Sequence, residues 1–526
     1  MTAIRRPERV LAAAAGLLAG LAMALPPAAE AQYFGRNKVR YENPDVRVLA
    51  SEHFDIYAYA EEDELAADAA VLMERWHHRL GSALDHELRG RQPLILYAGH
   101  PHFRQTNATP GEIGEGTGGF TEMFKRRIVL PSAGAGAETD HVLGHELVHA
   151  YQFDIARKLA EDPSGVTRRA SALRLPLWFI EGMAEYLSLG SADAHTAMWM
   201  RDAVHHDDLP TLRKLNSPRY FPYRYGHAFW AYVAGRYGDA VVPKLLRTAA
   251  TVGDVERAIR MELKIDSKQL SKDWQEALKQ EFGPAVAAGK PADDYGRVLI
   301  KAKKGKGSIN LSPVLSPDGK RLLFFSERDL FSIELYVVDV DSGKVLRRLT
   351  RSVTDPHLDS LQFLHSAGSW SPDGKRVVVG GVGAGRPLLT IIDADTGDTV
   401  EEHRFPELVE VLHPAWSPDG RQIAFAGNDG GVLTLQLFDL EKKERRALTQ
   451  GPAAALQPAW SPDGRQMVFV TDRFTSNLAQ MTYGDYRLAR LDLASGAISA
   501  LPALEGGSAI NPQWSPDGSQ VYFVSA

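Results

Sequence analysis

Apolar residues form two kinds of pattern in the first half of the chain, helical spacing and short continuous runs. Between Glu61 and Leu88 they recur at helical spacing among strong helix formers, which predicts a long amphipathic helix. Short continuous apolar runs predict buried strands at Pro93–Tyr97 and Arg127–Leu130. Together with helices expected over 140–160, 177–189, 228–237 and 267–282, this pattern predicts a mixed α/β domain over residues 32–283.

The pattern changes beyond about residue 308, where one short motif repeats. Ser-Pro-Asp-Gly occurs in five copies, which start 55, 46, 44 and 54 residues apart, and each precedes a run rich in strand formers. This separation between successive copies fits one four-stranded propeller blade per repeat. Pro fixes φ in a turn and Gly closes it, so the motif predicts a corner between two strands. The copies begin at Ser316, Ser371, Ser417, Ser461 and Ser515, and Trp precedes the Ser in the last four.

These repeats resemble those of TolB-type propellers, and the resemblance covers residues 308–526. It implies an all-β propeller whose motif residues build the blades and carry no chemistry. Ala526 follows the last motif closely, which leaves room for about two strands of the fifth blade. Because a propeller needs closure to protect its sheet edges, we expect an incomplete final blade, completed by a longer chain or by a segment from elsewhere.

The first 31 residues match the pattern of a secretory signal peptide. Arg5 and Arg6 precede an apolar stretch from Val10 to Leu25, and Ala29-Glu30-Ala31 offers a cleavage site. A membrane anchor is the alternative, but the apolar stretch is short for a span. We therefore expect an exported chain, periplasmic or secreted, with no membrane span after removal of the signal.

Composition narrows the class of protein further. The formal net charge is −6, which argues against a general nucleic-acid binder because phosphate binding needs a basic surface. The chain has no cysteine and so no disulfide. Residues 284–307 are rich in Ala, Gly, Pro and Lys and predict a solvated linker between the two domains.

The segment with candidate chemistry lies inside the helical pattern at 140–160. His145-Glu146-Leu147-Val148-His149 is a His-Glu-x-x-His motif. Residues four apart share a helix face, so His145 and His149 can bind one metal ion together. Glu146, next to them, can reach a water on that metal as a general base. By itself the motif is only a good indication of a metallopeptidase.

A second run downstream strengthens this interpretation. Trp178-Phe-Ile-Glu181-Gly182-Met-Ala-Glu185-Tyr186 is similar to the W-x-x-E-G-x-A-E-Y pattern of gluzincin peptidases. The resemblance implies Zn²⁺ as the cofactor and Glu181 as its third ligand, with Glu185 hydrogen-bonded to a ligating histidine or serving as the alternative ligand. The 31 residues between His149 and Glu181 exceed the usual gluzincin spacing, and we expect a loop around 161–171 to absorb the excess. A metzincin would need His at position 155, which is Ile.

Three further features are candidates for parts of this site. His141 lies one turn before His145 and is either a fourth ligand, which would make the zinc structural, or an outer residue. The glycine-rich run 114–119 leads into an edge strand that could pair with an extended substrate, or is a flexible loop. Tyr223 matches the spacing of the tyrosine that stabilises the transition state in aminopeptidase relatives; Tyr225 is its rival, and a plain core or surface tyrosine is the third possibility.

These features together predict a multidomain chain, an α/β gluzincin-like metallopeptidase domain followed by an all-β propeller. The resemblance implies hydrolysis of peptide bonds, with Glu146 and Tyr223 as catalytic residues and His145, His149 and Glu181 as zinc ligands. The propeller would bind the peptide or protein substrate or a protein partner, by analogy of fold. The alternative is a catalytically silent, propeller-based binding or scaffold protein with a structural zinc site.

Overall fold

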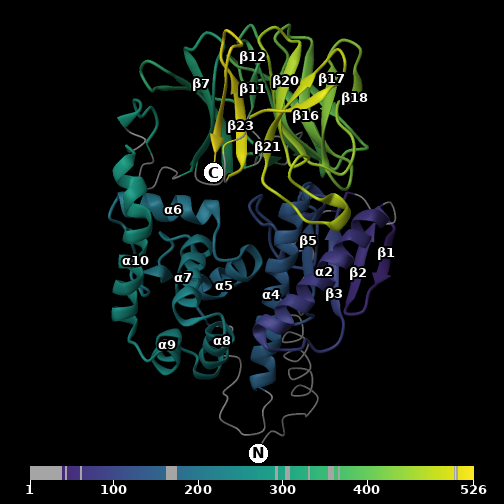
Figure 1. Ribbon diagram of the computed structural model, residues 1–526. Helices are drawn as coiled ribbons and strands as arrows, with labels where there is room; N and C mark the ends of the chain where they lie inside the picture. Colours follow the sequence, from purple (N-terminus) through teal and green to yellow (C-terminus); the bar gives the residue numbers. More distant parts are fainter. Residues whose placement is uncertain are drawn as a thin grey trace, which may run out of the picture.

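The computed structural model describes residues 38, 40–41, 44–59, 62–160, 175–290, 294–301, 309–329, 332–352, 360–364, 368–502, 504 and 507–525. The expected signal peptide, 1–31, and the expected loop at 161–171 lie outside these residues. The described chain forms an N-terminal region of mixed helix and sheet and a C-terminal region of β-sheets that lies over it (Figure 1). Within the described part, no helix has both the length and the apolar character that a membrane span requires.

A five-stranded sheet forms one side of the N-terminal region. Its order is β1-β2-β3-β5-β4, with β2, β3 and β5 parallel and β4 antiparallel at the edge. Burial alternates along β3, as expected for a strand with one face on the core. The strands are β1 (Val46–Ala50), β2 (Phe54–Tyr59), β3 (Gln92–Tyr97), β4 (Phe120–Thr121) and β5 (Ile128–Pro131).

Helices make up the rest of this region. The predicted long helix is α2 (Asp63–Leu84), which packs on the sheet beside α4 and shares one core with it. Helices α5 to α10 form a second layer on the other side of α4 (Figure 1). The remaining helices are α3 (His100–Phe103), α4 (Gly136–Ala160), α5 (Leu177–Leu189), α6 (Ala194–His205), α7 (Pro222–Tyr237), α8 (Val241–Val252), α9 (Val255–Leu263) and α10 (Ser267–Ala288).

Three helices extend beyond the predicted ranges, and the first of them, α4, begins at Gly136 rather than 140. Helix α7 begins at Pro222 rather than 228, because proline is tolerated in the first turn, where its missing N–H has no intrahelical partner. Helix α10 continues past Gly283 to Ala288 and includes Pro284. This proline lies in the last turns of the helix, where the surrounding side chains are partly exposed and water can satisfy the freed carbonyl.

The C-terminal region is a series of antiparallel sheets that follow the sequence repeat. Four sheets have four or five strands, and the fifth described sheet pairs only β23 with β24. Their strands are β6 (Asn310–Leu315), β7 (Arg321–Asp329), β8 (Ser332–Asp339), β9 (Val345–Arg348), β10 (Ser360–Leu361), β11 (Ser369–Trp370), β12 (Arg376–Gly383), β13 (Arg386–Asp393), β14 (Thr399–Arg404), β15 (Glu410–Trp416), β16 (Gln422–Asn428), β17 (Leu433–Asp439), β18 (Glu444–Ala447), β19 (Ala455–Trp460), β20 (Gln466–Thr471), β21 (Arg487–Asp492), β22 (Ile498–Ala500), β23 (Ala509–Trp514) and β24 (Val521–Ser525).

Each Ser-Pro-Asp-Gly motif lies at a turn between two adjacent strands, as predicted; in the second blade these strands are β11 and β12. In the first copy, the Ser316 hydroxyl donates to Asp318 Oδ1 at 2.6 Å and accepts from the Arg321 N–H at 2.9 Å. Gly319 has a φ of 71°, a left-handed conformation that favours glycine. The Trp before the motif reaches the previous blade in three copies, in which the indole of Trp370 donates to Val314 O, that of Trp460 to Ala415 O and that of Trp514 to Ala459 O. The Trp416 indole instead donates to Gly420 O in its own turn. The repeat therefore sets both the corner of a blade and its contact with the previous one.

The two regions meet at the end of the sheet and the start of α4. The Leu433 N–H donates to Gly134 O at 2.7 Å, and the Tyr486 hydroxyl donates to Glu138 Oε1 at 2.6 Å. The Glu410 carboxylate accepts from the His100 N–H at 3.0 Å. The first turn of α4 is therefore held by contacts with the β-sheet region.

Candidate metal centre

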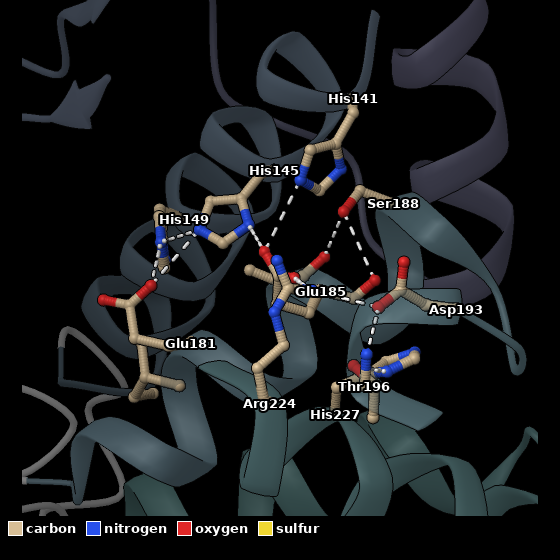
Figure 2. A network of polar contacts seen from close by, with 12 residues as sticks. His141, His145, His149, Glu181, Glu185, Ser188, Asp193, Thr196, Arg224 and His227 are labelled. Atoms are coloured by element: carbon tan, nitrogen blue, oxygen red, sulfur yellow. Dashed lines mark hydrogen bonds and ion pairs between the residues drawn. The ribbon is translucent and has the colours of Figure 1, made fainter. Parts of the chain in front are cut away.

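Helix α4 presents the two histidines of the motif, and His141 before them, on one face. His141, His145 and His149 are each one turn apart, and Figure 2 shows their rings in a row. The helix is fixed against α2 at Gly144, where an added Cβ would come within 2.6 Å of the Trp76 ring. The Trp76 indole also donates to Asp140 Oδ1 at 2.7 Å. This close packing sets the rotation of α4 and with it the direction of the histidines.

Helix α5 brings Glu181 to two of these histidines. Glu181 Oε2 lies 3.2 Å from His145 Nε2 and 3.2 Å from His149 Nε2, and the two Nε2 atoms are 3.2 Å apart (Figure 2). A tetrahedral zinc ion with ligand distances of about 2.0–2.1 Å holds its ligand atoms about 3.3–3.4 Å apart. The three donors, two imidazole nitrogens and a carboxylate oxygen, therefore fit zinc in both type and spacing.

Glu185 lies on the other side of His145. Its Oε1 is 3.0 Å from His145 Nδ1 and 3.5 Å from His141 Nε2 (Figure 2). Because His145 directs Nε2 toward Glu181 and Nδ1 toward Glu185, the two carboxylates contact opposite edges of one ring. His141 therefore belongs with Glu185 and lies outside the group formed by His145, His149 and Glu181.

One residue that was not predicted from the sequence, Gln152, holds the His149 imidazole in place. Gln152 Oε1 lies 2.8 Å from His149 Nδ1, and its amide donates to Ile180 O at 3.0 Å. An acceptor at Nδ1 keeps the proton on that nitrogen and leaves Nε2 free to bind a metal. Gln152 follows His149 by three residues on the same helix, and that spacing is the signal that could have found it.

Arg224 contacts the Glu185 oxygen that does not face His145. Its Nη1 donates to Glu185 Oε2 at 2.9 Å and to Asp193 Oδ2 at 3.1 Å (Figure 2). Asp193 is also the N-cap of α6, since it accepts from the Thr196 N–H. No local sequence signal reveals this chain of contacts, because its members lie on separate elements.

The charges of the group are strongly coupled. Burial disfavours a charge on His145, but its hydrogen-bond contacts with Glu181 and Glu185 outweigh burial and raise its pKa to about 10. Burial opposes the ionised form of Glu181 as well, yet the two imidazoles lower its pKa to about 2. Buried carboxylates thus stabilise positive charge between them, which protons or a metal cation can supply.

Glu146 lies between the edge of the sheet and the metal-binding group, where its charge acts on both histidines. The Thr121 hydroxyl lies 2.8 Å from Glu146 Oε2, and a Cβ at Gly119 would come within 3.1 Å of Glu146 Cγ. The absence of a side chain at Gly119 thus lets the segment that enters β4 approach Glu146. An extended chain beside β4 would pass this carboxylate.

Tyr223 and Tyr225 have different surroundings. The Tyr223 ring stacks on His145, with centroids 5.8 Å apart and planes 20° from parallel. Burial, together with the negative charges of Glu181 and Glu146, raises the pKa of Tyr223, so its hydroxyl keeps a proton to donate. Tyr225 is buried in the helical core, where its ring packs against Tyr220. Only Tyr223 of the two adjoins the metal-binding group.

A second group of possible ligands, His53, Glu74 and His77, lies at the surface between β2 and α2. The two rings are stacked, with centroids 3.9 Å apart and planes 19° from parallel, so their in-plane nitrogens do not converge on one point. Glu74 is already satisfied by Ser51 and by the backbone and ring of His53. This group serves as a hydrogen-bonded corner of the fold.

Comparisons with known proteins agree with the division into two regions. A family model described as TolB beta propeller domain matches residues 358–526. The C-terminal part of the chain is an all-β, TolB-like propeller region. A second family model, described as Peptidase of plants and bacteria, matches residues 126–240, which contain α4, α5 and Tyr223. No curated protein matches the chain.

Solved structures similar to this chain include TolB proteins. One, described as a TolB from Agrobacterium tumefaciens, is 24% identical with a TM-score of 0.35, covering 42% of this chain and 76% of that one. TolB from Acinetobacter baumannii is 20% identical with a TM-score of 0.33, covering 49% of this chain and 68% of that one.

Proposed function

We propose that the chain is an exported, zinc-dependent peptidase whose metal centre is formed by His145, His149 and Glu181. The observation that carries the proposal is the mutual spacing of 3.2 Å among these three donors, beside a glutamate that is not one of them. The match of residues 126–240 to a peptidase family supports it. The propeller would bind substrate or a protein partner.

Zinc held by these residues would polarise the scissile carbonyl and lower the pKa of an attacking water molecule. Glu146 takes the proton of that water as general base, because its carboxylate adjoins the group without belonging to it. Tyr223 donates a hydrogen bond to the substrate oxygen that gains negative charge, since its hydroxyl stays protonated. Gln152 and Glu185 fix the two imidazoles by their Nδ1 atoms.

The position of His141 favours this function over a structural zinc site. A structural site has four protein ligands and no open position. His141 Nε2 faces Glu185 Oε1 at 3.5 Å, behind His145, so it would have to turn away from that carboxylate to act as a fourth ligand. The fourth position is thus left for water and substrate. Export is proposed from the signal-like residues 1–31.

Metal analysis paired with a peptide-library digest tests the proposal. The purified mature protein should contain one zinc per chain and cleave peptides; a chelator should abolish cleavage, and added zinc should restore it. A protein that contains zinc and cleaves nothing in a broad library would instead be a binding or scaffold protein. A protein that binds no zinc would refute the metal centre itself.

A further inference from the structure

A row of aromatic rings leads from the metal-binding group to the protein surface. Tyr223 stacks on His145, the Phe221 centroid lies 5.1 Å from that of Tyr223, and the Trp199 centroid lies 5.6 Å from that of Phe221. Neighbouring planes in this row are tilted by only 20–33°. The rings come from α4, from the start of α7 and from α6, so their alignment depends on how three helices pack.

The outer members of this row are exposed to an unusual degree for their type. Phe221 is 42% exposed and Trp199 is 37% exposed, and Met198 beside it is 48% exposed. Large aromatic side chains are mostly buried, and apolar side chains that are exposed next to one another indicate an interaction surface. We call Trp199 and Phe221, whose rings are in contact, the aromatic shelf.

Two arginines that flank Phe221 in sequence are engaged elsewhere: Arg219 pairs with Asp208, and Arg224 pairs with Glu185 and Asp193. Arg224, three residues after Phe221, turns its guanidinium toward Glu185 and Asp193 and away from solvent. Because the shelf itself carries no charge, it selects an occupant by apolar contact and ring stacking. The inner ring of the shelf, Phe221, lies against Tyr223 at the metal-binding group, so the occupant must be part of a molecule that also reaches the reacting atoms.

We infer that the aromatic shelf is the subsite that selects an aromatic or large aliphatic side chain of the substrate, near the bond to be cleaved. This inference rests on the peptidase function proposed above and specifies its substrate class. A peptide extended along β4 passes Glu146 and Tyr223, and a side chain projecting from it toward α6 lies on Phe221 and Trp199. A Gly or Ala at that position would leave the shelf in water, and a Phe or Leu would cover it.

The test compares short quenched-fluorescence peptides that carry either Phe or Gly at each position around the cleaved bond. We expect the wild type to prefer Phe at one position by about tenfold to a hundredfold in kcat/KM, the range that apolar contacts supply. In Trp199→Ala and Phe221→Ala this ratio should fall toward one, and in Phe221→Leu it should be largely kept. Met261→Ala, an equally exposed apolar side chain on α9, is the control and should keep the full ratio.

Binding measurements separate this inference from the proposed function. With Glu146→Gln protein, the Phe peptide should bind about tenfold more tightly than its Gly partner by calorimetry, and the added Phe221→Ala change should remove the difference. This result would support the shelf even in a protein that cleaves nothing. Equal binding of both peptides would overturn it. So would a dimer that dissociates in Trp199→Ala with peptide preference unchanged, because the shelf would then be a contact between two copies.

Discussion

At the scale of single residues, His145 is held from both of its ring nitrogens. Nε2 faces Glu181 and Nδ1 faces Glu185, and Arg224 and Asp193 hold Glu185 in turn. A carboxylate at Nδ1 fixes the ring and strengthens Nε2 as a donor to a metal. Glu185 is therefore a positioning residue, and its effect should appear in metal affinity before it appears in the fold.

Replacing Glu185 tests this role. Glu185→Gln keeps the size of the side chain but removes the charge, so zinc affinity should fall about tenfold to a hundredfold. Competition against a chelator of known affinity measures the change. Asp208→Asn, which disturbs an exposed ion pair with Arg219 far from the histidines in sequence, should leave zinc affinity unchanged. Unchanged affinity in Glu185→Gln would show that the carboxylate does not support His145.

The sequence predicts part of this site and misses the rest for a physical reason. His145 and His149 are predictable because helical spacing alone puts both on one face. Glu181 is predictable only from the resemblance of its surroundings to gluzincin peptidases. Arg224 and Asp193 are not predictable, because their contacts with Glu185 depend on how separate helices pack.

At the scale of elements, the crossing of α5 and α7 positions the site. The two helices touch at Gly182 and Gly226, where a Cβ on either residue would overlap the backbone of the other helix. This crossing places Glu181, next to Gly182, and Tyr223, one turn before Gly226, on the same side of the helix pair. The sequence indicates each helix, but only the structure reveals that these glycines permit the contact.

A pair of glycine substitutions on α7 tests the crossing. Gly226→Ala should lower the free energy of unfolding by about 1–3 kcal/mol, because the added methyl group forces the helices apart. Gly235→Ala lies on the same helix with nothing near its Cβ, and should raise the free energy of unfolding by about 0.5–1 kcal/mol. Urea denaturation measures both changes. Equal effects from the two changes would contradict a backbone contact at Gly226.

At the scale of the whole molecule, the propeller and the helical region share a buried interface. Glu410 lies there with its carboxylate between the His100 N–H and the Asn428 amide, and burial raises its pKa to about 7. Nothing in the sequence around Glu410 predicts this contact, because its partner His100 belongs to the other region. The sequence does predict the two regions themselves, since the helical patterns of the first give way to the repeated Ser-Pro-Asp-Gly motif of the second.

Glu410 should make stability depend on pH near neutrality. Because its pKa is higher in the folded protein than the usual 4.5, the folded state holds the proton more tightly. Its contribution to stability is therefore full below about pH 4.5 and is lost as the pH rises to about 7. Glu410→Gln has no group that ionises at this position. Its free energy of unfolding should therefore exceed that of the wild type by up to about 3 kcal/mol at pH 8 and by little at pH 4.5. Thermal unfolding of both proteins across this pH range measures the difference. A difference that does not vary with pH would contradict a raised pKa of Glu410.

The most direct test of the account as a whole is the activity and zinc content of Glu146→Gln. Glu146 adjoins the three donors but is not one of them, so the variant should bind one zinc per chain and unfold at the wild-type temperature. Peptide hydrolysis should fall by about a hundredfold or more, because no base remains to take the proton of the attacking water. His149→Ala should lose zinc together with activity. If Glu146→Gln cleaves peptides at the wild-type rate, Glu146 is not the base and the proposed mechanism is wrong.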